Sequence, residues 1–310
     1  MTSQPVTREW RPDWPCSVGA ALGGLRRGGG DPTYRMVGDT HWRGIRTPEG
    51  PATLAIEPRS AEGVVRAQAW GPGADWALAS VPALLGAEDD VSGFEPRLPV
   101  LEEAWRRHGR WRIGRTGLVM EALVPSIIEQ KVTGQEAFAG FRMLVHRYGE
   151  RAPGPGAELK LWVQPSADVI RQVPSWEWLR MHVDPARSRT LVTAARVAGS
   201  LERTVGLPGD EVERRLCSLP GIGVWTAAEV RQRAHGDPDA VSFGDYHVAA
   251  DVGWAVRGSD FDDAELAEFL EPWRPHRGRV VTLLLLTGPR RPRHGARMAP
   301  RTHLPAKVTR

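Results

Sequence analysis

The sequence predicts an α+β protein that combines a mainly α-helical core with a small N-terminal α/β sheet lobe. Two observations support this fold class. The strand-like segments lie within residues 1–95, where short apolar runs are separated by turns that contain Gly and Pro. From about Leu98 to Leu286, apolar residues recur instead at helical spacing. The length of 310 residues leaves room for two or three lobes.

The N-terminal lobe, residues 1–95, is expected to hold strands that pair through tight turns. The segment Pro48-Glu49-Gly50-Pro51 separates two such strands and is typical of a hairpin turn. Gly28-Gly29-Gly30 and Gly71-Pro72-Gly73 mark the ends of other elements. The predicted elements are a short helix within 14–25, strands over 41–46, 52–57 and 63–70, and a helix over 74–85.

The helical core is expected over residues 96–287, folded in two lobes. Phe138, Phe141, Leu144 and Tyr148 share one helix face, and Ser166 is a favourable N-cap. The predicted helices span 100–108, 120–130, 135–148, 166–172, 175–181, 185–201, 210–218, 225–234, 264–270 and 278–286.

The composition is that of a globular protein with a moderately basic surface. Hydrophobic residues make up 41% and charged residues 25% of the chain. A formal net charge of +4 permits a polyanionic partner without demanding one. The first ten residues lack the apolar stretch of a signal peptide, and the apolar run over 280–286 is too short to cross a membrane. A cytoplasmic location is therefore expected.

The last segment, 288–310, has no apolar periodicity and is expected to be disordered. It has two interpretations, a solubilising end of the chain or an arm that tethers DNA. It contains no acidic residue and seven basic ones: Arg290, Arg291, Arg293, Arg297, Arg301, Lys307 and Arg310.

The stretch from Leu219 to Asp245 carries the strongest functional signal. Its Leu-Pro-Gly-Ile-Gly turn joins two predicted helices in a helix-hairpin-helix unit over 210–234, and a loop over 236–247 follows. Gly221 and Gly223 let the backbone turn and let another backbone come close. The N–H groups at the start of the second helix then face outward, which suits a phosphate.

These residues resemble the helix-hairpin-helix DNA glycosylases, and within them 3-methyladenine DNA glycosylase II, the AlkA type. The likeness rests on Leu219-Pro220-Gly221-Ile222-Gly223, Trp225-Thr226-Ala227 and Asp245-Tyr246. The hairpin alone also occurs in polymerases and ligases, whereas the hairpin, the Trp-Thr-Ala and a later Asp that opens a new helix are together specific. AlkA-type enzymes also carry a small N-terminal sheet lobe.

The resemblance implies a site in which Asp245 is the catalytic carboxylate. A monovalent cation, Na⁺ or K⁺, would bridge hairpin carbonyls near Leu219 and Ile222 to a DNA phosphate. No other metal or cofactor is implied, and the four-cysteine iron–sulfur cluster of the endonuclease III type is absent, because the only cysteines are Cys16 and Cys217. The hairpin residues implied to bind DNA are Gly221, Ile222, Gly223, Val224 and Thr226.

Asp245 has a second interpretation as the N-cap of a helix that begins at Tyr246. The two roles are compatible, because helix N–H groups favour a carboxylate in its charged form.

The plug that fills the gap left by a flipped base is implied to lie within 127–133. There Gln130, Lys131 and Val132 would face the minor groove. Relatives usually carry Leu or Gln where this chain has Lys131, whose aliphatic stem can fill space while its ammonium meets a phosphate. The alternative is an ordinary helix end with a solvated lysine.

The resemblance places Trp225, Tyr246, Glu229 and His276 in or beside the substrate pocket. Trp225 stands where backbone-cutting relatives have a Schiff-base lysine, so a monofunctional enzyme is implied. Glu229 replaces a tyrosine and His276 a tryptophan of the AlkA-type pocket, and Glu229 is expected to attract a cationic purine. Alternatively, Trp225 packs in the core and Glu229 is solvated or pairs with Arg233, four residues on.

The sequence thus predicts a monomeric, nucleoid-associated DNA glycosylase that acts on double-stranded DNA with a damaged base. It would flip out and hydrolyse alkylated purines in base excision repair, with Asp245 stabilising the oxocarbenium-like transition state. Glu229 and His276 leave open a preference for deaminated or bulky purine adducts. The alternative from another class of protein is a non-catalytic helix-hairpin-helix DNA-binding protein. The Asp245 carboxylate and the N-terminal lobe argue against it, because a pure binding module needs neither.

Overall fold

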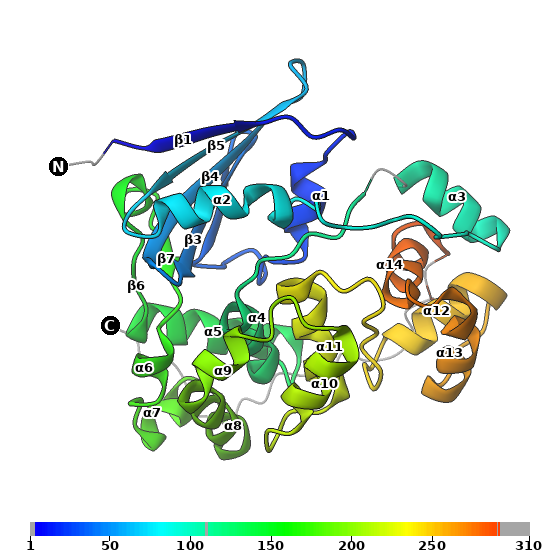
Figure 1. Cartoon of the computed structure of the whole chain (residues 1–310). Coiled ribbons are helices and arrows are strands. Elements are labelled where there is room, and N and C mark those ends of the chain that lie inside the picture. Colours follow the sequence, from blue (N-terminus) through cyan, green and yellow to red (C-terminus); the bar gives the residue numbers. More distant parts are fainter. Residues whose placement is uncertain (1–3, 109–110, 290, 292–310) are drawn as a thin grey trace.

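The computed structural model describes residues 4–108, 111–289 and 291 of the chain. Figure 1 shows a sheet lobe above a helical body, with a smaller group of helices at one side. Each of the three parts has its own hydrophobic cluster. The predicted class, a mainly helical core with a small N-terminal sheet lobe, is confirmed. The predicted boundaries at residues 95 and 287 stay predictions, and residues 292–310 of the predicted tail lie outside the described residues.

The N-terminal sheet is antiparallel, with the strand order β1-β5-β4-β3-β2. The hairpin predicted at Pro48–Pro51 joins β3 and β4, in register from Thr47↔Gly50 to His41↔Ile56. The edge strands β1 and β2 were not predicted, because their side chains are largely exposed and show no clear alternation. The strands are β1 (Val6–Trp10), β2 (Tyr34–Val37), β3 (Thr40–Thr47), β4 (Gly50–Arg59) and β5 (Val64–Trp70).

Two helices cover this sheet and close the first core. Helix α1 (Val18–Gly23) is capped by Ser17, whose hydroxyl accepts from Ala20 N at 3.4 Å. Helix α2 (Ala74–Leu84) packs on β4 and β5 through its buried apolar face. The predicted helix over 74–85 is thereby confirmed within one residue.

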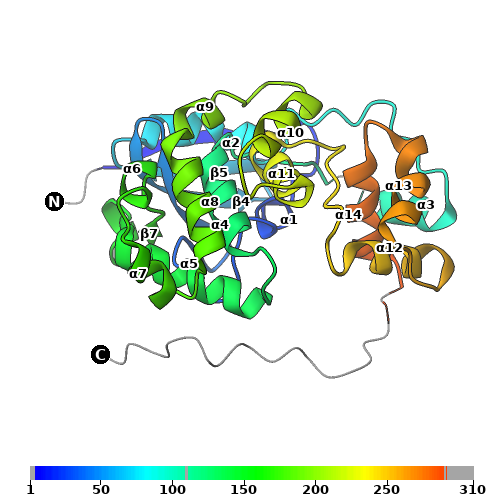
Figure 2. The same ribbon diagram turned by 90° about the horizontal axis from the view of Figure 1, so that it is seen from below.

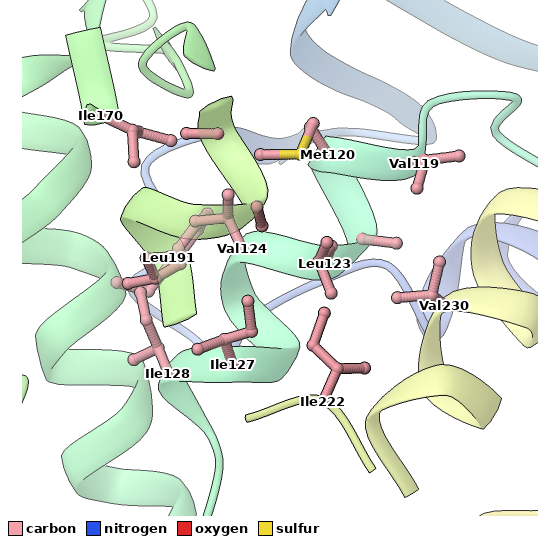
Figure 3. Close-up of a cluster of buried hydrophobic side chains, with 14 of the residues drawn as sticks. Val119, Met120, Leu123, Val124, Ile127, Ile128, Ile170, Leu191, Ile222 and Val230 are labelled. Carbon is pink, nitrogen blue, oxygen red and sulfur yellow. The ribbon is translucent and has the colours of Figure 1, made fainter. Parts of the chain in front are cut away.

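Helix α4 (Val119–Ile128) is the centre of the helical body, and all of its residues except Glu121 are buried. A helix that is apolar all round must be enclosed by its neighbours. Figure 3 shows Leu123 and Ile127 of α4 beside Ile222 and Val230, which belong to the hairpin unit. The other elements of this body are α5 (Gly134–Tyr148), β6 (Glu150–Arg151), a 3₁₀ turn (Gly154–Gly156), β7 (Trp162–Val163), α6 (Ala167–Ile170), α7 (Ser175–Arg180), α8 (Pro185–Arg196), α9 (Ala198–Glu202), α10 (Gly209–Cys217) and α11 (Val224–Val230).

The third part joins one early helix to the end of the chain, and Figure 2 shows it set apart from the helical body. Asp89 and Arg279 form a fully buried ion pair of 2.5 Å that fixes the segment after α2 to the last helix. Its elements are α3 (Pro99–His108), α12 (Val248–Arg257), α13 (Asp263–Leu270), a 3₁₀ turn (Glu271–Trp273) and α14 (Arg277–Thr287). Within the described residues, no helix is long and apolar enough to cross a membrane.

Several predicted helix boundaries are corrected. The helices predicted over 120–130 and 166–172 end two residues earlier, at Ile128 and Ile170. The helix predicted over 185–201 is divided into α8 and α9 at Val197 (φ −115°, ψ 16°), where a β-branched residue and Gly199 lower the helix propensity. The helix predicted over 225–234 is α-helical to Val230 and continues as a π-helix over Arg231–His235.

The π-helix ends at Gly236, which has the left-handed conformation. The helix expected to begin at Tyr246 begins instead at Val248. Tyr246 and His247 form a turn before it, and His247 (φ −113°, ψ −34°) is the N-cap of α12.

Candidate active site

The hairpin between α10 and α11 is a turn that requires glycine at position 221. Gly221 has a left-handed φ of 88°, and a Cβ there would lie 2.0 Å from Oγ1 of Thr190 in α8. Ile222 is 5% exposed and belongs to the main hydrophobic core. The turn is therefore clamped between α8 and the core, which fixes the position of every atom that it presents outward.

Gly223 plays a different part in the same hairpin. Its φ of −104° suits any residue, and a Cβ there would meet nothing within 4 Å. It is the N-cap of α11 without a capping side chain, and Val224, which follows, is 51% exposed. The first N–H groups of α11 thus start a helix that lacks a cap, beside open space at Gly223.

The predicted plug segment is tied directly to this hairpin. Gln130, two residues after the end of α4, donates from Nε2 to the Gly221 carbonyl at 3.0 Å and to Oγ1 of Thr226 at 2.8 Å. The next residue, Lys131, is exposed and has a φ of 54°, which is uncommon for a side chain other than glycine, asparagine or aspartate. Val132 is partly buried against the main core. Gln130 therefore fixes the spacing between plug and hairpin, and the turn presents Lys131 outward.

Asp245 is held on both of its carboxylate oxygens. Oδ2 accepts the indole N–H of Trp225 at 3.1 Å. Oδ1 accepts the backbone N–H groups of His247 at 2.8 Å and Val248 at 3.2 Å, at the start of α12. Asp245 is not the N-cap that the alternative predicted, because the N-cap of α12 is His247, but its carboxylate still accepts the N–H groups just before and at the start of that helix. The carboxylate stays partly exposed. Tyr246 is 86% exposed and makes an edge contact with the His247 ring.

The loop over 236–247 that carries Asp245 is pinned by ion pairs. Asp237 accepts from Nε of Arg231 in the π-helix at 2.8 Å. Asp239 accepts from Nε and Nη2 of Arg277 in α14 at 2.9 and 2.7 Å. Such two-point pairs fix direction as well as distance. The loop is therefore held between the hairpin unit and the third part of the molecule.

Glu229 lies one helical turn after Trp225, and its carboxylate is engaged. It is 9% exposed, pairs with Nη1 of Arg233 at 2.7 Å and accepts from Oγ of Ser242 at 2.6 Å. The predicted alternative, a pair with Arg233, is thereby confirmed. The negative charge of this carboxylate is already compensated by Arg233 and by the Ser242 hydroxyl. Glu229 therefore lacks the unpaired charge with which it was expected to attract a cationic purine.

A second ion pair lies beside Glu229 and links the sheet lobe to α4. Nη1 of Arg27 is 3.0 Å from Oε1 of Glu129, the residue before Gln130. Burial raises the pKa of Glu129 and lowers the pKa of Arg27, because water is excluded from both. Arg233 also donates to the Gly24 carbonyl at 3.2 Å. The hairpin unit and the residue before the plug thus make polar contacts with the N-terminal lobe.

His276 has its contacts in the third part of the molecule. It is 6% exposed, its Nε2 lies 3.3 Å from the Ser92 carbonyl, and its ring packs edge-on against Phe94. Nε of Arg279 lies 3.5 Å from its other ring nitrogen. These partners belong to the core around the Asp89–Arg279 pair, so its predicted place in the pocket is not supported by its contacts.

A cavity of about 270 Å³ lies between the sheet lobe and the helical body. Its lining includes Arg43, Glu121, Gln164 and Glu202, and it includes none of the predicted site residues. The predicted site is therefore a surface feature around Asp245 rather than this cavity. Among the described residues, no group of three or more His, Cys, Asp or Glu side chains is arranged to hold a metal ion.

The sequence identified several members of this site but not all of them. Trp225 and Asp245 come together, as do Gln130, Gly221 and Thr226. Ser242 and Gln232, which contact each other at 3.1 Å, were not predicted. A serine in a loop and a glutamine in a helix carry no distinguishing pattern, so no signal in the sequence marks them.

No protein-family model matches the chain. The chain is 29% identical over 209 residues to a probable bifunctional transcriptional activator/DNA repair enzyme AlkA of Mycobacterium tuberculosis. The match covers 66% of this chain and 38% of that protein, so the chain spans well under half the length of the curated relative.

Among solved structures, a 3-methyladenine DNA glycosylase from Archaeoglobus fulgidus is similar, with a TM-score of 0.77 and 18% identity over 90% of this chain and 97% of that one. An 8-oxoguanine glycosylase/lyase of Clostridium acetobutylicum, solved with double-stranded DNA, has a TM-score of 0.66 and 12% identity, over 92% and 97%. The chain therefore has the fold of the helix-hairpin-helix DNA glycosylases, and the resemblance to the AlkA type that its hairpin predicts is confirmed.

Proposed function

We propose that the chain is a monofunctional DNA glycosylase that flips a damaged purine out of double-stranded DNA and hydrolyses its glycosidic bond. The observation that carries the proposal is the setting of Asp245, whose carboxylate is gripped by Trp225 and by the start of α12. The similarity to AlkA and the shared fold support it. Alkylated purines are the proposed substrates, and base excision repair is the proposed process.

DNA binding is proposed for the surface that joins hairpin and plug. Gly221 fixes the turn, and Gly223 leaves space for a phosphate at the start of α11. Gln130 ties the plug to this turn, so a strand held at the hairpin meets Lys131 at a set distance. The Clostridium acetobutylicum protein of the same fold was solved with double-stranded DNA, which supports the same partner here.

Asp245 is proposed to stabilise the sugar as its bond to the base breaks. The sugar then gains positive charge, and a fixed anion beside it lowers the energy of the transition state. Donors on both carboxylate oxygens hold Asp245 before the substrate arrives, so little reorganisation is needed. A water that attacks the sugar can be oriented by the same carboxylate, which completes hydrolysis of the bond.

The proposed enzyme releases the base without cutting the backbone. A lyase needs an amine that attacks the sugar carbon and forms a Schiff base. At this place the chain has Trp225, whose indole nitrogen donates to Asp245 and cannot act as an amine nucleophile. The similar Clostridium acetobutylicum structure is named a glycosylase/lyase, so this position is where the two chains are proposed to differ in chemistry.

The paired state of Glu229 favours a second substrate class. A free carboxylate beside the base would select cationic alkylated purines, but Glu229 is already neutralised by Arg233. Neutral purines that have lost an amino group, such as hypoxanthine, are therefore a second candidate. Both classes share the purine ring and differ in charge, which makes them separable by experiment.

A monovalent cation is proposed at the hairpin, where carbonyl oxygens are its natural ligands. The Leu219 carbonyl accepts the Ile222 N–H at 3.1 Å, whereas no described backbone N–H outside a helix donates to the Ile222 carbonyl. When bound, Na⁺ or K⁺ would supply positive charge opposite a DNA phosphate.

The proposed function is tested by scoring base release from duplexes that each carry 7-methylguanine or hypoxanthine, and from methylated DNA that contains 3-methyladenine. Abasic sites are revealed by alkaline cleavage, and binding to the same duplexes is measured in parallel. Release of at least one of these bases supports the proposal. Binding to every duplex without any release would identify a DNA-binding protein without catalysis.

A further inference from the structure

We infer that Ser242 and Glu229 are positioning residues, which hold the loop around Asp245 in the geometry needed for base release. The inference rests on the proposed function and deepens it. It gives a role to Glu229, one of the two residues at which this chain departs from AlkA-type pockets. In this role Glu229 acts through Ser242 on the loop and does not touch the base.

The first support is that one face of α11 contacts the loop at two points. Trp225 and Glu229 are four residues apart and therefore lie one above the other on the helix. The upper contact joins Nε1 of Trp225 to Asp245 at 3.1 Å. The lower contact joins Oε1 of Glu229 to the hydroxyl of Ser242 at 2.6 Å. Two contacts along one rigid helix fix both the place and the tilt of the loop.

Ser242 transmits this hold to Asp245 through the backbone. Its hydroxyl donates to Glu229 and accepts from Nε2 of Gln232 at 3.1 Å. Its carbonyl accepts the N–H of Asp245 at 3.2 Å, which closes a turn from Ser242 to Asp245. The same Gln232 nitrogen donates to the Ala240 carbonyl at 3.1 Å. The segment before Asp245 is thus bonded to α11 and the π-helix at two successive points.

The buried surroundings of Glu229 make its hydrogen bond with Ser242 strong and hold it in place. Ser242 is 6% and Glu229 is 9% exposed, so neither group has water as an easy substitute partner. A hydroxyl bonded to a carboxylate is among the stronger hydrogen bonds in proteins. Arg233 donates from Nη1 to both the carboxylate, at 2.7 Å, and the backbone carbonyl of Glu229, at 3.0 Å. Arg233 therefore fixes the Glu229 side chain, and Glu229 in turn holds the Ser242 hydroxyl.

The consequence is a rate that depends on Ser242 without any contact between Ser242 and DNA. A misplacement of a catalytic group by about 1 Å can cost on the order of a hundredfold in rate. Loss of the Ser242 hydroxyl frees one end of the turn while Trp225 still holds the other. We therefore expect Ser242→Ala to slow single-turnover base release by about 10- to 100-fold.

The test compares Ser242→Ala, Glu229→Gln and the double variant with wild type and with Ser126→Ala. Ser126 is 0% exposed and donates to the Ala122 carbonyl within α4, so it is a matched loss of a buried hydroxyl away from the loop. Two readouts are taken. Single-turnover release is measured on 7-methylguanine and hypoxanthine duplexes, with affinity for an abasic duplex. Hydrogen exchange of the peptide over 236–247 is followed by mass spectrometry.

The inference predicts equal proportional losses on both lesions, nearly unchanged affinity, and faster exchange of the 236–247 peptide. The double variant should be no slower than about the slower single variant, because Ser242→Ala removes the same contact that Glu229→Gln weakens. Ser126→Ala should match wild type in both readouts.

Three results would overturn it: Ser242→Ala rates within about twofold of wild type, unchanged exchange of the peptide, or a Glu229→Gln loss confined to the cationic lesion. If wild type releases no base, the proposed function fails, and the exchange measurement still decides whether Ser242 fixes the loop.

Discussion

Trp225 and Asp245 are 20 residues apart in the sequence, yet the indole N–H of Trp225 donates to Oδ2 of Asp245 at 3.1 Å. The contact joins the first turn of the second hairpin helix to the loop that leads into α12. The element proposed to grip a phosphate and the element proposed to stabilise the sugar are therefore one rigid unit. Hydrogen bonds from His247 and Val248 complete the setting of the carboxylate.

Trp225→Phe tests whether this contact orients Asp245. The change keeps an aromatic ring but removes the indole N–H. Hydrogen bonds to charged groups are worth about 1.5–3 kcal/mol, so single-turnover base release should slow by about 10- to 100-fold. Trp76→Phe in α2 of the sheet lobe is the matched control and should keep the wild-type rate. A Trp225→Phe enzyme as fast as wild type would show that the indole does not set the carboxylate.

The two hairpin glycines should respond in opposite ways to alanine. Gly221→Ala forces a Cβ into a left-handed residue and against Thr190, so the free energy of unfolding should fall by about 1–3 kcal/mol. Gly223→Ala meets no neighbour, so stability should stay within about 0.5 kcal/mol of wild type while DNA binding weakens. Urea unfolding and fluorescence anisotropy measure the two quantities. Equal DNA binding by Gly223→Ala and wild type would argue against a phosphate at this point.

Reduction with borohydride during the reaction should trap no covalent complex between protein and DNA. Trapping needs a Schiff base between an amine and the opened sugar, and Trp225 offers none. The reaction is run on a cleavable lesion and read as a shifted band on a denaturing gel. A strong band in wild type would contradict a monofunctional enzyme. If the band disappeared in Lys131→Gln, Lys131 would be the amine.

His235 should make stability depend on pH. Burial lowers its pKa below the ordinary 6.5, so between the folded value and 6.5 the unfolded state binds more protons than the native state. The free energy of unfolding should therefore rise as pH rises through that window, and fall as pH falls through it. His235→Gln keeps a polar partner for Thr204, whose hydroxyl lies 3.0 Å from Nε2, but does not titrate. Urea unfolding across this range should show a flatter profile for the variant, and an identical slope would exclude His235.

The sequence predicted the parts of the fold whose signals are local. Helix α5 and its neighbours follow apolar spacing, and the Ser166 cap bonds to Val169 N as expected. The β3–β4 hairpin follows from its turn residues. Strands β1 and β2 were not predicted, because an exposed edge strand needs no alternation of apolar and polar residues. The division of the helix at Val197 was not predicted, because the apolar spacing of 185–201 continues across it.

For the site, the sequence supplied the residues that stand in motifs, and folding supplied their partners. Glu229 with Arg233 was an open alternative, since spacing of four residues allows a pair but does not decide it. The sequence could not decide whether Glu229 contacts a base or the loop over 236–247. Its partner in that loop, Ser242, comes close only when the loop folds back on α11. His276 was assigned to the pocket because it replaces a tryptophan of AlkA-type pockets, but its contacts are with Phe94 and with Ser92, which lies 184 residues earlier. Partners at such separations leave no local pattern.

The most direct test of the account is base release by Asp245→Asn beside wild type on the same lesion duplexes. The change keeps the shape of the side chain and removes its charge. If Asp245 stabilises the sugar, single-turnover release falls by about a hundredfold or more, while affinity for an abasic duplex stays within a few-fold of wild type. Release by Asp245→Asn within a few-fold of wild type would contradict the assignment of Asp245, and with it the proposed chemistry of the site.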